Sequence, residues 1–176
     1  MKKTTKSKTT KSATRRNSEL QLVGWREWLS LPELGIARIK VKVDTGARTS
    51  ALHAFEIRPF KQANKHYIRF KIHPLQRRTD LVIKCLAEVK DIRWVVDSGG
   101  HRERRYVIQT PIQMGGVEWS IELTLTNRDT MNFRMLLGRT AMRNRIMVNP
   151  AVSFLSDSRM TGAFAHRHPL HMKVGK

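Results

Sequence analysis

The sequence predicts an all-β protein, a small closed β fold with one short helix. Two segments, 37–43 and 117–126, carry this prediction, because apolar and polar side chains alternate strictly in both. Such alternation is typical of a strand that is buried on one face. Helical periodicity is scarce elsewhere, and many short strands with little helix favour a closed or sandwiched sheet.

Shorter strand-like runs and turn signals complete the predicted sheet. Gly115-Gly116 precedes the second alternating segment, and Ser98-Gly99-Gly100 marks another turn. One short helix is expected after Gly138, over 140–144. The shorter strand-like runs are 22–28, 67–72, 81–85, 106–110 and 146–148.

Composition bounds the class of protein. The 176 residues include 34 Lys or Arg and 14 Asp or Glu, which gives a formal net charge of +20. This length fits one domain, and 40% hydrophobic residues suffice for a single core. The chain has no long apolar run, so we expect no membrane span. No apolar stretch of a secretory signal follows the basic start, and one cysteine, Cys85, allows no internal disulfide. We therefore expect a cytoplasmic protein.

Charge and polarity divide the chain into three parts. Residues 1–18 are rich in Ser, Thr and Lys and lack acids, so we expect a disordered basic tail. Residues 19–155 are the expected folded domain, and residues 156–176 are an expected flexible tail. A disordered tail offers positive charge without a defined binding surface, so we expect it to bind nucleic acid only nonspecifically.

The strand over 37–43 runs directly into Asp44-Thr45-Gly46-Ala47, which presents an acid where a buried strand ends. Gly46 lets the backbone pass close to a neighbouring group. Thr45 can hydrogen-bond across an interface while Asp44 points at a cleft. The alternative interpretation is an ordinary Asx-type turn, which this sequence forms readily.

Two separated motifs carry a resemblance to a known family. Residues 43–47 read apolar-Asp-Thr-Gly-Ala and residues 136–139 read apolar-apolar-Gly-Arg, a combination that resembles the retropepsin-like aspartic peptidases. More narrowly, the chain resembles a bacterial family often labelled ATP-dependent zinc proteases, and the similarity covers 23–155. The stretches that carry this narrower resemblance are 31–36, 43–54, 105–108, 122–128 and 136–139.

The residues do not support either half of that label. The chain contains no His-Glu-x-x-His motif and no Gly-x-x-x-x-Gly-Lys-Ser/Thr nucleotide loop. His53, Cys85 and His101 could gather around a metal, but a histidine after an apolar residue is more often packed or hydrogen-bonded. We therefore predict no metal and no cofactor.

The resemblance implies hydrolysis of a peptide bond by two aspartates that share one proton. One chain supplies one matching Asp, so the resemblance implies a homodimer with the site on its two-fold axis. It assigns catalysis to Asp44, with Thr45 and Gly46 as the supporting turn, and structural support to Leu137 and Gly138. The residues expected to bind a protein or peptide substrate are Ala47, Arg48, Ser98, Gly99 and Arg139.

A second acid offers an alternative. Asp97 lies in a similar apolar-apolar-Asp-Ser-Gly context and would make a one-chain peptidase. However, Asp97 comes only 53 residues after Asp44, and one apolar-apolar-Gly-Arg segment cannot support two catalytic turns. We interpret 94–105 as a flap-like hairpin in which Asp97 is a turn residue.

Arg48 stands where retroviral relatives carry an aspartate, so two arginines, Arg48 and Arg139, are expected near the cleft. Unless Glu33, Glu103, Glu122 or Asp129 neutralises them, they would bind carboxylates. The alternative is that the two arginines have a structural pairing role. Members of the resembled family lie beside ATP-grasp glutamate ligases, which suggests acidic or glutamylated protein substrates and a functional link to such a ligase.

The alternative function is a non-catalytic basic β-barrel module that binds ribosomes, RNA or a partner ligase. The charge of +20 supports it. An RNA-binding sheet usually interleaves exposed aromatic and basic residues. Trp119 instead lies on the apolar face of its predicted strand, and Tyr67 and Phe70 fall on opposite faces. The sequence pattern therefore favours an enzyme.

Overall fold

The computed structural model describes residues 20–96, 99–127 and 132–156. The predicted tails, 1–18 and all but the first residue of 156–176, lie outside the described residues, as do Asp97 and Ser98. The described strands and helices, in chain order, are β1 (Gln21–Gly24), β2 (Arg26–Leu31), the 3-10 helix η1 (Pro32–Leu34), β3 (Ile36–Asp44), β4 (Ser50–His53), β5 (Phe55–Gln62), β6 (Lys65–Ile72), β7 (Ile83–Val96), β8 (Arg102–Met114), β9 (Val117–Thr126), β10 (Met135–Gly138), α1 (Arg139–Met142) and β11 (Ile146–Asn149).

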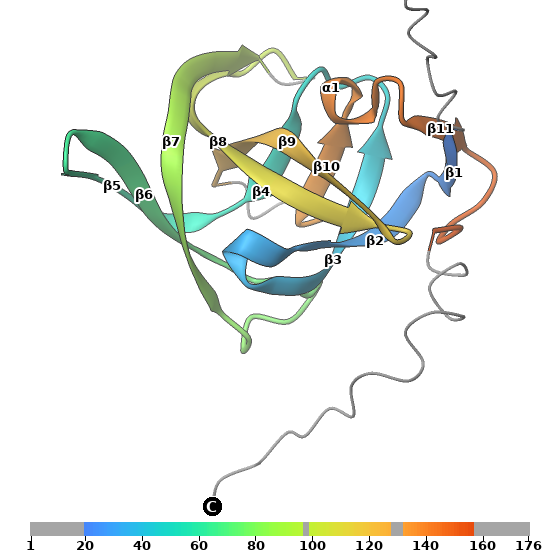
Figure 1. Cartoon of the computed structure of the whole chain (residues 1–176), viewed down its shortest axis with the longest axis horizontal. Coiled ribbons are helices and arrows are strands. Elements are labelled where there is room, and N and C mark those ends of the chain that lie inside the picture. Colours follow the sequence, from blue (N-terminus) through green and yellow to red (C-terminus); the bar gives the residue numbers. More distant parts are fainter. Residues whose placement is uncertain (1–19, 97–98, 128–131, 157–176) are drawn as a thin grey trace, which may run out of the picture.

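The strands form one large mixed sheet that closes on itself (Figure 1). Its order is β2-β3-β10-β4-β9-β8-β7-β6-β5, and a further pairing of β2 with β8, through Ser30 and Gln113, completes a ring of hydrogen-bonded strands. β1 and β11 form a separate two-stranded parallel sheet. The predicted all-β closed fold with one short helix is confirmed.

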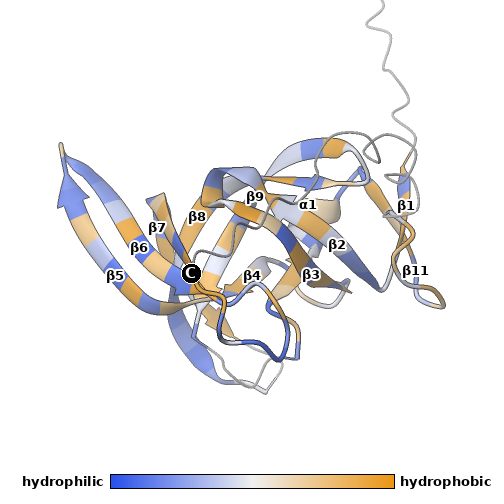
Figure 2. Cartoon of the chain, turned by 90° about the horizontal axis from the view of Figure 1, so that it is seen from below, coloured by the Kyte–Doolittle hydropathy of each residue, from blue (hydrophilic) through white to orange (hydrophobic). Residues whose placement is uncertain are grey.

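Both strictly alternating segments are strands, as predicted. Ile39, Val41 and Val43 of β3 are buried, and so are Trp119 and Ile121 of β9. The alternation fails at the strand ends, where Ala37 and Val117 are exposed and Thr124 and Thr126 are buried. The ribbon coloured by hydropathy shows the same alternation along the strands (Figure 2). A closed sheet needs this pattern because one face of each strand packs inside the ring.

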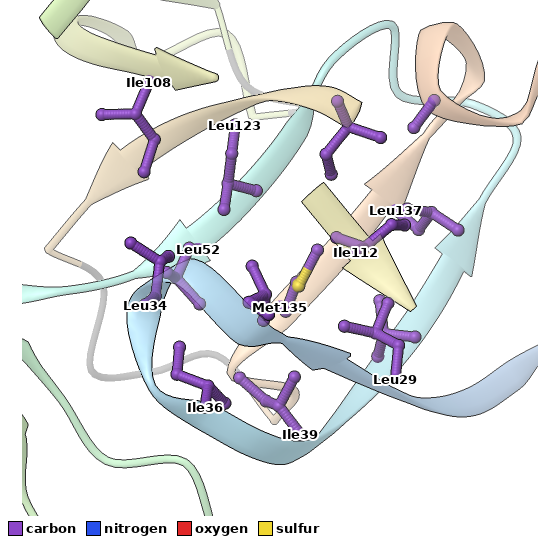
Figure 3. Packing of buried hydrophobic residues seen from close by; sticks show 14 of the residues in the cluster. Leu29, Leu34, Ile36, Ile39, Leu52, Ile108, Ile112, Leu123, Met135 and Leu137 are labelled. Carbon is purple, nitrogen blue, oxygen red and sulfur yellow. The ribbon is translucent and has the colours of Figure 1, made fainter. Parts of the chain in front are cut away.

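The core fills the interior of the ring. Side chains from β2, β3, β4, β8, β9 and β10 converge there, as the close view shows (Figure 3). Leu52 and Met135 lie on the antiparallel pair β4 and β10 and are fully buried. Each such side chain contributes about 1.5–3 kcal/mol through burial. Trp119 joins the helix to this core, because its Nε1 donates a hydrogen bond to the Ala141 carbonyl at 2.9 Å.

Several details differ from the sequence-based expectation. The run 22–28 is two strands, β1 and β2, because the chain bends at Trp25 and pairs with different partners on either side. The helix covers Arg139–Met142 rather than 140–144. β5 was not predicted at all; with β6 it makes a hairpin that projects from the ring (Figure 1). Among the described residues no helix is long and apolar enough to cross a membrane.

Candidate active site

Asp44 ends β3, which lies beside β10 in the sheet. The two strands run parallel, with Val43 opposite Leu137 and Asp44 opposite Gly138. On its other side β10 pairs antiparallel with β4, the strand that follows the Asp44 loop. The chain before the loop and the chain after it are therefore held by one central strand, which fixes where Asp44 emerges.

The loop after Asp44 folds back onto its carboxylate. The backbone N–H groups of Gly46 and Ala47 each donate a hydrogen bond to Asp44 Oδ1 at 3.0 Å. The other carboxylate oxygen has no hydrogen-bond partner within 20–96, 99–127 and 132–156. Asp44 is half-buried, whereas Thr45 and Gly46 are exposed. The Asx-type turn considered above thus exists, and it orients the acid while leaving one oxygen accessible.

Arg139 holds the same loop from the side of the helix. Its Nη1 donates to the carbonyls of Thr45 at 3.0 Å and Gly46 at 3.1 Å, and its backbone N–H donates to Ala47 O at 2.9 Å. The backbone N–H and the Oγ1 of Thr140 both donate to Arg48 O. The first turn of α1 therefore fixes the backbone of every residue from 45 to 48.

Gly138 lets this packing form. A Cβ atom at this position would lie 2.5 Å from the carbonyl carbon of Thr49 and 2.9 Å from the backbone nitrogen of Ser50. The Gly138 N–H donates to Ser50 Oγ at 3.1 Å, and Thr124 Oγ1 of β9 donates to Ser50 O at 2.9 Å. Ser50 and Thr124 were not singled out in the sequence. The sequence carries no signal for Thr124, which falls on the polar side of the alternating segment 117–126 although the structure buries it.

A groove of about 540 Å³ opens beside the loop. Arg48 and Arg139 both line it, so the structure brings these two arginines together, whereas Asp44, Ala47 and Gly99 are not among the residues that line it. Arg143, which the sequence analysis did not name, contributes a third guanidinium. The groove is lined by Thr45, Arg48, Arg139, Thr140, Met142, Arg143, Asn144, Ile146 and Val148.

β7 and β8 make the hairpin expected as a flap. They pair from Val89 and Ile108 to Val96 and Arg102, and Gly99 lies in the turn between them. The outer part of this hairpin exposes Trp94, whose ring lies under the Arg102 guanidinium at 4.7 Å.

The remaining candidate residues are two carboxylates that form ion pairs, a buried cysteine and two histidines. Glu103 pairs with Arg105, and Glu122 pairs with Arg93, whose guanidinium lowers the pKa of that carboxyl. Cys85 is buried in β7, and burial raises the pKa of its thiol to about 11. Within the described part of the chain no three His, Cys, Asp or Glu side chains gather as metal ligands, so His53, Cys85 and His101 do not form such a group.

Comparisons with known proteins show the family and the fold of the chain. Residues 22–159 match the family model described as RimB-like, the retropepsin-like aspartic endopeptidase RimB. A solved structure of a Legionella pneumophila protein of unknown function (DUF785) is similar with a TM-score of 0.65 and 25% sequence identity, covering 79% of this chain and 99% of that one.

Longer curated proteins also match. A probable alpha-L-glutamate ligase of Shewanella pealeana is 48% identical over 133 residues, which are 76% of this chain and 29% of that protein. Another of Parasynechococcus marenigrum is 47% identical over 150 residues, 85% of this chain and 32% of that protein. The chain thus spans about a third of the length of these relatives, in which the same domain is fused to a ligase. The chain belongs to the RimB-like family of retropepsin-like aspartic endopeptidases.

Proposed function

We propose that this chain is an aspartic endopeptidase in which two protomers each contribute Asp44. The observation that carries the proposal is the loop after β3, which orients Oδ1 of Asp44 through two N–H groups and leaves its second oxygen open. In a dimer the two carboxyls would face each other and share one proton, because like charges held this close cannot both ionise. The protonated acid polarises the scissile carbonyl, and the ionised one takes a proton from the attacking water.

The exposure of the loop supports a homodimer. Thr45 and Gly46 lie at the surface of a single chain although their backbone is held rigidly by Arg139. A rigid, exposed loop next to the acid is suited to packing against its own copy across a two-fold axis. The described residues of one protomer supply one such acid, Asp44, and the second protomer would supply the other.

The groove supports an acidic substrate. Among the described residues, Arg48 and Arg143 form no ion pair, and Glu103 and Glu122 are already paired elsewhere. Arg48 is exposed, so its guanidinium is available to a carboxylate, which it can bind through two hydrogen bonds. Relatives named as glutamate ligases carry this same domain. We therefore propose glutamate-rich or glutamylated proteins as substrates and a functional link to such a ligase, in the cytoplasm, where Cys85 stays reduced.

Peptide cleavage tests the proposal. Purified wild type and Asp44→Asn are incubated with a mixed peptide library from acid to neutral pH, with and without a metal chelator, and the oligomeric state is measured in parallel. We expect cleavage by wild type that the chelator does not change and that Asp44→Asn abolishes. Cleavage that survives in Asp44→Asn, or that the chelator abolishes, contradicts the aspartic mechanism.

A matched pair of variants tests the substrate class. Arg48→Ala should shift the cleavage sites away from acidic neighbours, because it removes a carboxylate-binding group beside the loop. Lys61→Ala removes one exposed charge from the distant β5–β6 hairpin and should leave the preference unchanged. An unchanged preference in Arg48→Ala contradicts the acidic-substrate part of the proposal alone.

A further inference from the structure

The outer face of β2 and β3 carries an unusual arrangement of positive charge. Cross-strand pairing sets Arg26 opposite Lys42 and Trp28 opposite Lys40. Phe154, from the segment after β11, stacks on Trp28 with ring centroids 6.1 Å apart and an interplanar angle of 23°. We call these five residues the β2–β3 basic face.

Aromatic rings hold the cations of this face in place. Lys40 Nζ lies 5.0 Å from the centroid of the Trp28 ring and 5.6 Å from that of Phe154. The Arg26 guanidinium lies 5.1 Å from the Phe154 ring, and a neighbouring cation, Arg38, lies 4.4 Å above Trp28. Cations and rings therefore alternate across the face, and the contacts reduce the freedom that these side chains would lose on binding a ligand.

Within the described residues, no carboxylate neutralises Arg26, Lys40 or Lys42 of this face. The ion pairs of the described chain lie instead on β5 to β9 and their connections. Like charges directly opposite each other, such as Arg26 and Lys42, are unfavourable in a sheet. An anionic ligand would relieve this repulsion.

We propose that the β2–β3 basic face binds a single-stranded nucleic acid. The cations suit the phosphates of a backbone, and the half-buried rings of Trp28 and Phe154 suit the stacking of bases. An acidic peptide would use the charge but gain nothing from the rings. This inference does not depend on the proposed peptidase activity, because the face uses none of the residues of the Asp44 loop.

Fluorescence anisotropy of the full chain tests the inference. The probes are labelled twelve-nucleotide oligouridylate and oligothymidylate, titrated at several salt concentrations. The central variant is Lys40→Gln/Lys42→Gln, and the matched control is Lys61→Gln/Arg69→Gln, which removes the same charge from the β5–β6 hairpin and likewise takes one cation from an aromatic ring. The termini are identical in both variants, so their contribution cancels.

We expect the central variant to bind about tenfold more weakly and to lower the slope of log affinity against log salt by about 1.4, or about 0.7 for each lost phosphate contact. Trp28→Ala should weaken binding about tenfold with an unchanged salt slope, because it removes stacking rather than charge. Thermal unfolding confirms that each variant is folded. If Trp28→Ala does not fold, the lysine variant still tests the inference, because it keeps all of the aromatic rings.

Three outcomes overturn the inference. The first is that neither oligonucleotide binds wild type. The second is that the control variant weakens binding as much as the central variant, which would assign binding to overall charge. The third is that a twelve-residue oligoglutamate displaces the oligonucleotide and binds the face as tightly, which would make the face a peptide site.

Discussion

Glu27 is a completely buried carboxylate that joins β2 to the last described segment of the chain. Its Oε1 accepts hydrogen bonds from Gly24 N at 2.6 Å and Leu155 N at 2.9 Å. Its Oε2 accepts from Ser156 N at 3.2 Å and Ser156 Oγ at 2.6 Å. Replacement by alanine removes the acceptor for all four bonds and leaves buried N–H groups without partners.

The size of the effect follows from these contacts. Hydrogen bonds to a charged group contribute about 1.5–3 kcal/mol each, so four would sum to more than about 6 kcal/mol. Leu155 is only half-buried, and water can replace part of the loss there. We expect Glu27→Ala to lower the free energy of unfolding by about 3–4 kcal/mol, close to the cost of breaking other buried charged networks. Glu27→Gln keeps one carbonyl oxygen and should cost about half as much.

Urea unfolding followed by tryptophan fluorescence measures this loss, which corresponds to a fall in Tm of roughly 10 °C. The matched control is Glu118→Ala, which removes an exposed carboxylate and should change the unfolding free energy by less than about 0.5 kcal/mol. Limited proteolysis should also cut Glu27→Ala near 153–156 faster than wild type. A loss below about 1 kcal/mol in Glu27→Ala would refute the reasoning that this carboxylate holds the segment.

Four further predictions concern the loop and the thiol. Gly138→Ala should lower peptide cleavage at least tenfold and destabilise the fold by about 2–4 kcal/mol, because the new Cβ atom would meet the Thr49 backbone. Cleavage assays and urea unfolding measure the two effects, and wild-type values in both would contradict the prediction. Arg139→Ala should lower kcat by about tenfold because the loop carbonyls lose their donor, whereas Arg143→Ala, in the same groove, should retain the wild-type kcat. The Cys85 thiol should react with iodoacetamide only slowly at pH 8 in the folded protein, because burial raises its pKa to about 11 and the thiolate is the nucleophile. The folded-state pKa exceeds the ordinary value of 9.0, so the neutral thiol stabilises the folded state. This contribution to the free energy of unfolding is complete below about pH 9 and is lost as the pH rises through about 11. Urea unfolding at several pH values measures it.

The strands that the sequence predicted best are those with one buried face. β3 and β9 each place alternate residues in the core, so the period of two is visible in the sequence. β5 shows this alternation only over its first four residues, Phe55–Arg58, before Pro59 and Phe60 interrupt it. All of its side chains are exposed or only half-buried, and Glu56 adopts a positive φ of 47°. Its conformation depends on pairing with β6, which no local pattern encodes.

The Asp44 loop was predictable because its chemistry lies in consecutive residues. The support of that loop was only partly predictable. Gly138 and Arg139 were found through a motif, but the hydroxyl bonds of Ser50 and Thr124 depend on β4 and β9 lying side by side. Hydroxyl side chains occur throughout the strands, and only the register decides which of them meet a backbone group.

The sequence of β2 also indicates that Glu27 is buried. This residue has the same parity in β2 as the buried Leu29 and Leu31, so an acid occupies a position where the pattern requires an apolar residue. A carboxylate in such a position is costly unless several donors satisfy it. The donors come from residues 24, 155 and 156, two of which are more than a hundred positions away, so the sequence could show the conflict but not its resolution.

The aromatic and basic residues of the β2–β3 basic face come from different segments, so no single strand shows them interleaved. Trp28 and Lys40 belong to different strands, and Phe154 arrives from the end of the domain. Glu27 holds that end through Leu155 and Ser156, the two residues that follow Phe154. Glu27→Ala should therefore weaken both the fold and the oligonucleotide binding of this face, while Asp44→Asn should leave both intact. Separating the two variants in this way would assign stability and oligonucleotide binding to the contacts among β2, β3 and the segment after β11, and peptide cleavage to the Asp44 loop.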